Sequence, residues 1–126
     1  MAEQQTTLLI AEPGVELAAT LGPCLGEKGC MVKSVNNLKD VLIALQSETV
    51  RVLVLDADLA RDMGYDSIQI IKSLCRSLPI IITTEANNAE LESTIRQKGI
   101  FYYHVKSFGM DELMLAISSA LARSTT

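Results

Sequence analysis

The feature that most constrains the fold of this 126-residue chain is a regular alternation between two hydrophobic patterns. Short apolar runs, typical of buried strands, occur at residues 8–11, 52–55, 80–82 and 100–105, and a weaker alternating run covers 31–35. Segments with helical spacing follow these runs, at residues 14–28, 38–45, 68–75, 87–97 and 113–121. Five strand–helix repeats predict a parallel sheet with helices on both faces, because parallel strands need crossover connections.

Length and composition favour a single domain over residues 1–126, with an ordered core at about 7–123. The formal charge is −4 and the eleven basic residues are scattered along the sequence, which argues against direct binding to nucleic acid or to a membrane surface. The three cysteines have no metal-ligand spacing, and residues 1–7 are polar, unlike a secretory leader. We therefore expect a cytoplasmic protein without a membrane span.

Local signals predict how several helices begin. Asn36 or Asn37 is expected to cap the second predicted helix, and Asp66 or Ser67 the third. Pro23 falls in the middle of the first predicted helix, where a proline removes a backbone hydrogen bond. A kink or a shortened helix is expected there.

Polar side chains stand where the predicted strands end. The first strand ends at Glu12, the third at Asp56 with Asp58 close behind, the fourth at Thr84 and the fifth at Lys106. Taken singly, each of these residues marks a place where the chain meets water. In an open parallel sheet, however, ligands bind at the carboxyl ends of the strands, so these carboxylates, the hydroxyl and the ammonium group are expected to converge at one edge.

The ordered set of these residues resembles the response-regulator receiver domains of bacterial two-component signalling, over essentially the whole chain. Asp56 matches the aspartate that accepts a phosphoryl group in that family, and Gly64 matches a glycine eight residues later. Thr84, Lys106 and Phe108 match the residues that end or follow the fourth and fifth strands. The resemblance implies a flavodoxin-like (βα)5 fold with strand order 2-1-3-4-5.

The resemblance also implies a phosphorelay function, and not an enzyme. Asp56 would accept a phosphoryl group from a histidine kinase or phosphotransfer protein, and Thr84 and Lys106 would contact that group. Thr84 and Tyr103 would form the switch that changes the surface made by the fourth helix, the fifth strand and the fifth helix. An effector domain, or a second copy in a homodimer, would bind this surface.

A magnesium ion is the implied cofactor, with Glu12, Asp56 and the backbone carbonyl of Asp58 as its ligands. Magnesium prefers carboxylate and carbonyl oxygens, and it offsets the charge that gathers in phosphoryl transfer. Pro13 replaces the second acid of the family's metal-binding pair, so we expect the binding to be weak or absent. The side chain of Asp58 compensates only if it turns toward the site.

Other departures from the family pattern lie at the ends of the fourth and fifth strands. Glu85 stands where a small residue is usual, and its carboxylate either narrows the site or points into solvent. Ser107 replaces a proline, and we expect a trans peptide before it, because a cis bond there costs about 2.5–4 kcal/mol. In the aromatic run at residues 101–103, one ring faces outward as a partner surface or helices cover all three.

Three functions remain open on the sequence. A phosphorylatable receiver is supported by the match at Asp56, whereas Pro13, Glu85 and Ser107 favour a pseudo-receiver, a protein-interaction module independent of phosphate. A flavin-binding protein or enzyme is disfavoured, because residues 12–15 do not form a glycine-rich phosphate loop and the lone histidine is predicted inside a strand. Divalent-ion binding separates the first two functions.

Overall fold

The apolar runs form the five strands of one parallel sheet in the computed structural model, which describes residues 5–123. The strands are β1 (Gln5–Ala11), β2 (Val32–Val35), β3 (Thr49–Asp56), β4 (Ile80–Thr84) and β5 (Tyr102–Val105). Their order across the sheet is β2-β1-β3-β4-β5 and every pairing is parallel, so the predicted fold class and strand order are confirmed. Most of the polar chain ends, at residues 1–4 and 124–126, lie outside the described part.

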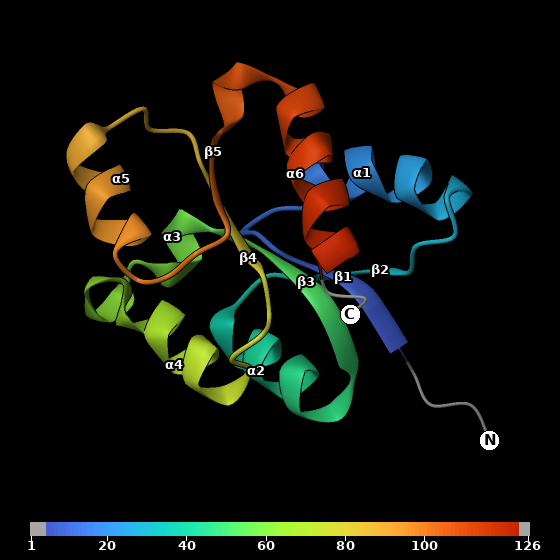
Figure 1. Cartoon of the computed structure of the whole chain (residues 1–126), viewed down its shortest axis with the longest axis horizontal. Helices are drawn as coiled ribbons and strands as arrows, with labels where there is room; N and C mark the ends of the chain where they lie inside the picture. Colours follow the sequence, from blue (N-terminus) through green and yellow to red (C-terminus); the bar gives the residue numbers. More distant parts are fainter. Residues whose placement is uncertain (1–4, 124–126) are drawn as a thin grey trace.

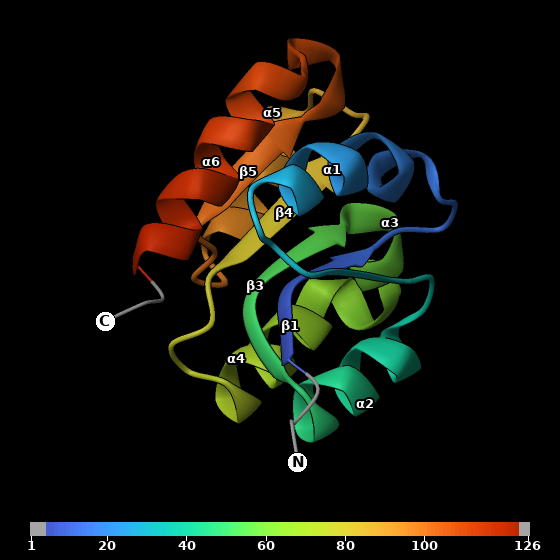
Figure 2. The ribbon, with the colours of Figure 1, turned by 90° about the vertical axis from the view of Figure 1, so that its right-hand side faces the viewer.

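Helices cover both faces of this sheet (Figure 1). The α-helices are α1 (Glu16–Glu27), α2 (Leu38–Ser47), α3 (Ala57–Ala60), α4 (Asp66–Leu74), α5 (Ala89–Arg96) and α6 (Met110–Arg123). Two short 3-10 helices, η1 (Asp62–Tyr65) and η2 (Lys106–Phe108), lie in the connections. Figure 2 shows α1 and α6 side by side on one face, with α2, α3 and α4 on the other. Within residues 5–123, every helix is too short or too polar to cross a bilayer.

Two hydrophobic cores hold these layers together, because alternate side chains of a strand point to opposite faces of the sheet. Leu9, Leu53 and Ile82 belong to the core under α2, α3, α4 and α5. Their neighbours Ile10 and Val54 belong to the core under α1 and α6. Both faces of the central strands are therefore buried, which explains why their sequences are continuous apolar runs.

Helix starts and stops agree with the sequence in part. Asn37 caps α2 by accepting a hydrogen bond from the backbone N–H of Asp40 at 2.8 Å, as predicted. The predicted cap of α4 is wrong: Tyr65 precedes the helix in the left-handed conformation, with φ 72°, and Asp66 is already helical. The first helix is not cut short at Pro23, since α1 continues through it to Glu27.

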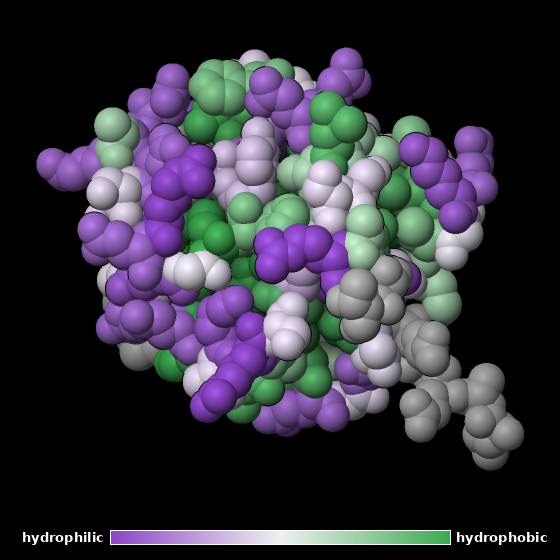
Figure 3. All heavy atoms as spheres, in the orientation of Figure 1, coloured by the Kyte–Doolittle hydropathy of each residue, from purple (hydrophilic) through white to green (hydrophobic). Residues whose placement is uncertain are grey.

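The surface of the domain mixes hydrophilic and hydrophobic side chains. On the face seen in Figure 3, hydrophilic side chains cover most of the area, and smaller hydrophobic areas lie between them. The exposed large hydrophobic side chains are spread over several elements and include Ile43 in α2, Leu74 in α4 and Leu115 in α6. The polar residues predicted for the site gather elsewhere, at the carboxyl ends of β1, β3, β4 and β5.

Candidate functional site at the carboxyl ends of the strands

Asp56 ends the central strand β3, and its carboxylate is almost fully buried, with the residue 3% exposed. One carboxylate oxygen accepts a hydrogen bond from the backbone N–H of Asp58 at 2.8 Å, so Asp56 also caps α3. The other oxygen lies 2.7 Å from the Nζ of Lys106, which directly follows β5. A cation and a helix start therefore fix the carboxylate from two sides.

Lys106 remains a cation at this position. Burial lowers the pKa of its amine and is the largest single influence, but the hydrogen bond and charge of Asp56, with the charges of Glu85 and Glu12, outweigh it and raise the pKa above its usual value. The peptide between Lys106 and Ser107 is trans, as predicted. The predicted approach of Lys106 to Asp56 is thus present without the family's proline.

Thr84 and Tyr103 lie diagonally to each other on the neighbouring strands β4 and β5, where Thr84 pairs with Val105 and Tyr103 with Ile82. Thr84 is buried at the end of β4, and its hydroxyl accepts a hydrogen bond from the backbone N–H of Ala86 at 3.1 Å. Tyr103 is buried in β5, with the guanidinium carbon of Arg96 5.9 Å from its ring centroid. Burial, with a contribution from the charge of Glu92, raises the pKa of Tyr103. The nearby side chain of Thr84 lowers this pKa. The Tyr103 hydroxyl has no hydrogen-bond partner among residues 5–123.

Glu12 has a role in the structure that the sequence did not reveal. Its side chain is buried, and its two oxygens accept hydrogen bonds from the backbone N–H groups of Leu17 at 3.0 Å and Ala18 at 2.9 Å. These N–H groups belong to the first turn of α1, which lacks a capping side chain at Val15. Glu12 thus satisfies the free donors and the positive end of this helix. An acid a few residues before an uncapped helix was the signal for this role.

The side-chain donors expected for a magnesium ion have other partners in this structure. The exposed side chain of Asp58 forms an ion pair with Arg61, so it does not compensate for the proline at position 13. Glu85 is exposed at the rim of the site. Within the described residues, no group of three or more Asp, Glu, His or Cys side chains could hold a metal. Asp56 is engaged with Lys106 and Glu12 with α1, so each side-chain donor already has another partner.

A cavity lies beside the carboxyl ends of the strands, between α1 and the segment that follows β5. Its volume is about 400 Å³, and Glu12, Lys106 and His104 contribute to its lining. His104 is buried in β5, the predicted strand position, and its Nδ1 has no hydrogen-bond partner among the described residues. Burial lowers the pKa of His104 and Lys106 lowers it further, while the charge of Glu112 opposes both.

The aromatic run at 101–103 does not form an exposed surface. Tyr103 is buried, and Phe101 and Tyr102 are half-buried against the core under α1 and α6. The interpretation in which flanking helices cover all three rings therefore holds for Tyr103 and only in part for Phe101 and Tyr102. The exposed aromatic side chain of this region is Phe108, which is 55% exposed in η2.

Comparison with known proteins agrees with this geometry. Residues 8–118 match the family described as response regulator receiver domain. The two-component response regulator PhoP of Pseudomonas aeruginosa PAO1 is 30% identical over 118 residues, which is 94% of this chain and 52% of that protein. The chain spans between about a quarter and about half of the length of the curated relatives that it matches.

Solved structures show the same fold. A CheY-like response regulator receiver domain protein from Methanospirillum hungatei JF-1 superposes with a TM-score of 0.82 at 16% identity, covering 97% of this chain and 98% of that one. A response regulator protein from Burkholderia pseudomallei, with a phosphorylated aspartic acid, a calcium ion and citrate, gives a TM-score of 0.77 at 18% identity. The comparison with the Burkholderia pseudomallei protein covers 96% of the present chain and 71% of that structure.

Proposed function

Because this chain belongs to the response regulator receiver domain family, we propose that Asp56 accepts a phosphoryl group from a histidine kinase or phosphotransfer protein. The family is a signalling module of two-component systems and not a family of catalytic enzymes. The observation that carries the proposal is the buried Asp56 carboxylate with Lys106 Nζ at 2.7 Å. The phosphorylated aspartic acid of the Burkholderia pseudomallei protein supports the same chemistry in this fold.

In the proposed transfer, a carboxylate oxygen of Asp56 attacks the phosphorus of a phosphohistidine. The P–N bond breaks, its electron pair stays on the imidazole and an acyl phosphate forms on Asp56. Lys106 then serves as the cation that pairs with the new phosphoryl oxygens, and the hydroxyl of Thr84 donates a hydrogen bond to one of them. No step is assigned to a metal ion, because the expected side-chain donors have other partners in this structure.

The output of this event is proposed to pass through Thr84 and Tyr103. The hydroxyl of Thr84 now accepts from Ala86, and turning it toward a phosphoryl group would break that contact. Tyr103 lies against Thr84 from the next strand, so a movement of one changes the packing of the other. The surface formed by α5, β5 and α6 would then change its affinity for an effector domain or a second copy.

A second function is favoured by a different observation. Glu12 caps α1, Pro13 carries no carboxylate and the side chain of Asp58 pairs with Arg61. This arrangement suits a pseudo-receiver, in which Lys106 and Asp56 form a fixed ion pair and the domain binds its partner without phosphorylation. The two functions differ in whether Asp56 changes partner.

An NMR titration with Mg²⁺ and then beryllofluoride, a mimic of the phosphoryl group, tests the proposal. We expect amide shifts centred on Asp56, Thr84 and Lys106 that extend to Tyr103. The variant Asp56→Asn keeps the fold and should show no such shifts. Absence of shifts at Asp56, Thr84 and Lys106 after beryllofluoride is added to the wild-type domain refutes the proposal in favour of the pseudo-receiver.

A gain-of-function variant sharpens this result. Pro13→Asp restores the missing acid, so it should strengthen Mg²⁺ binding and the beryllofluoride response if Asp56 and Lys106 are correctly placed. Ala19→Asp is a matched control, because it adds the same charge at an exposed position of α1 that does not line the cavity beside the site. If Pro13→Asp leaves both responses unchanged, the remaining groups do not form a phosphoryl site.

A further inference from the structure

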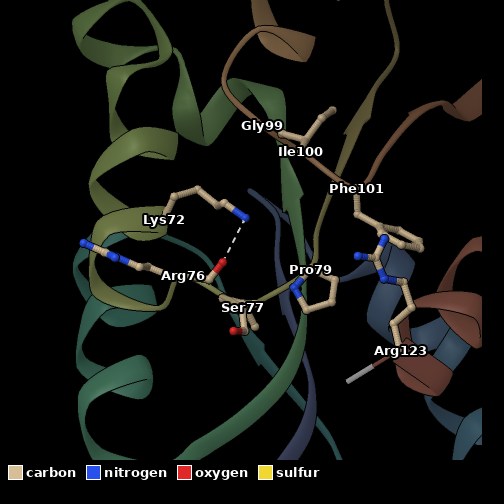
Figure 4. A pocket seen from close by; sticks show the side chains of 9 residues that line it. Lys72, Arg76, Ser77, Pro79, Gly99, Ile100, Phe101 and Arg123 are labelled. Carbon is tan, nitrogen blue, oxygen red and sulfur yellow. Dashed lines mark hydrogen bonds between the residues drawn. The ribbon is translucent and has the colours of Figure 1, made fainter. Parts of the chain in front are cut away.

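A basic cavity lies at the opposite edge of the sheet from Asp56, where β4 and β5 begin. Its volume is about 480 Å³, which is in the range of small-molecule sites. The end of α4, the turn before β4, the turn before β5 and the end of α6 enclose it, as Figure 4 shows. No predicted or observed feature of the phosphorylation site reaches this edge.

Cationic side chains line this cavity, and no Asp or Glu side chain of residues 5–123 does so. Lys72 from α4 and Arg123 from α6 point into it from opposite sides, whereas the guanidinium of Arg76 is directed away along α4 (Figure 4). Within residues 5–123, Lys72 forms no ion pair with an acidic side chain. Fifteen acidic residues outnumber eleven basic ones in the chain, so a cavity whose charged lining residues, among those described, are all basic is a local reversal of the overall charge.

The position of Lys72 is well defined. Its Nζ lies 3.3 Å from the carbonyl oxygen of Arg76, and its stem packs over the turn at Gly99, where an added Cβ would lie 3.9 Å from Lys72 Cε. A lysine in the last turn of a helix also offsets the negative end of the helix dipole. That role explains one cation, but it does not explain why Arg123 faces the same cavity from another element.

Basic residues also line a neighbouring cavity of about 490 Å³, which lies where β3 begins. This second cavity shares Arg76, Ser77 and Arg123 with the first and adds Arg51, and among the described residues no Asp or Glu lines it. The guanidinium of Arg51 donates to the carbonyl oxygen of Leu121 at 2.8 Å, which holds it at the end of α6. Basic residues from three separate parts of the sequence, Arg51, Lys72 with Arg76, and Arg123, therefore line the two adjoining cavities.

An apolar wall completes the first cavity. Phe101, Pro79 and Leu78 line it, and the guanidinium carbon of Arg123 lies 5.5 Å from the Phe101 ring centroid. Ammonium and guanidinium groups bind phosphate through short charge-assisted hydrogen bonds, and an apolar wall suits an organic group attached to it. We propose that this cavity binds a small organic molecule that carries a phosphate group.

Phenyl phosphate is the probe for this proposal, because it joins a phosphate to a ring. In NMR titrations we expect saturable shifts at Lys72, Ser77, Gly99 and Phe101, with tighter binding than inorganic phosphate. The double variant K72Q/R123Q should weaken the affinity at least about tenfold, since it removes two charge-assisted contacts. Absence of saturable shifts at these residues would overturn the proposal.

Controls separate this site from general charge effects and from the phosphorylation site. The double variant K28Q/K39Q removes the same charge from exposed lysines outside the groove, so the affinity should change by less than about twofold in physiological salt. The variant Asp56→Asn should leave phenyl phosphate binding unchanged, because Asp56 lies at the other end of the strands. An equal loss in K28Q/K39Q, or tighter binding of a hexaglutamate peptide than of phenyl phosphate, contradicts a small-molecule phosphate site.

Discussion

Replacement of Lys106 by methionine should reveal how strongly the fold depends on the pair with Asp56. The Asp56 side chain is 5% exposed, whereas the Lys106 side chain is 33% exposed. Lys106→Met leaves a buried carboxylate that, among the described residues, keeps the hydrogen bond from the backbone N–H of Asp58 alone. Breaking a fully buried pair costs about 3–5 kcal/mol, and the partial exposure of the lysine reduces our expectation to about 2–3 kcal/mol of unfolding free energy.

The reverse change should cost less. Asp56→Asn preserves an acceptor for the N–H of Asp58, and the freed ammonium of Lys106 can turn into the water that it already contacts. We expect a loss of about 1 kcal/mol or less. The double variant D56N/K106M should lose less than the sum of the single changes, because the two residues act as a pair.

Urea unfolding at pH 7, followed by circular dichroism because the chain has no tryptophan, measures these free energies. The slope of free energy against urea should be the same in all four proteins, which shows that only stability has changed. Equal losses in Lys106→Met and Asp56→Asn, or additive losses in the double variant, would refute the asymmetric burial argument.

Three further predictions concern single side chains. Glu12→Ala should cost about 2 kcal/mol in urea unfolding, because it removes both acceptors of the α1 N–H groups, and the exposed Glu16→Ala should cost clearly less. The stabilising contribution of neutral His104 should be complete above its ordinary pKa of 6.5 and decline as the pH falls, because burial lowers its folded-state pKa and the unfolded chain binds the proton more readily. His104→Asn should flatten that acid slope, and an unchanged slope would assign it to other groups. Tyr103→Phe should change the unfolding free energy by less than about 0.5 kcal/mol, since the hydroxyl has no partner among the described residues. A loss well above that value would show that the hydroxyl is hydrogen-bonded.

The sheet could be predicted from the sequence because each strand carries its own signal. The runs at β1, β3 and β4 are apolar on both faces, and only a parallel sheet covered by helices buries both. The same topology brings Lys106 to Asp56, fifty residues apart in the sequence, because both lie at the carboxyl ends of parallel strands. The start of α4 was missed, since a left-handed Tyr65 before a helix has no common sequence signal.

The candidate metal site was harder to predict, because each of its carboxylates can bind either a metal ion or another group of the protein. The carboxylate of Glu12 can bind either a metal or the start of α1, and the distance to Leu17 decides in favour of the helix. The Asp58 side chain similarly has Arg61 one turn away on the same surface. Residue type predicts what a side chain can bind, but the fold determines which partner lies within reach.

The basic residues show the same limit from the opposite direction. They are scattered along the sequence, which argued against an anionic partner, yet Arg51, Lys72, Arg76 and Arg123 meet at the edge where the central strands begin. Each of these four lies in or near an element that starts or ends at that edge, so strand order gathers them just as it gathers Asp56 and Lys106 at the other. In a parallel sheet both edges collect residues that are distant in sequence, and a linear charge count cannot detect either collection. The two edges therefore deserve separate tests: beryllofluoride with Asp56→Asn at one, and phenyl phosphate with K72Q/R123Q at the other.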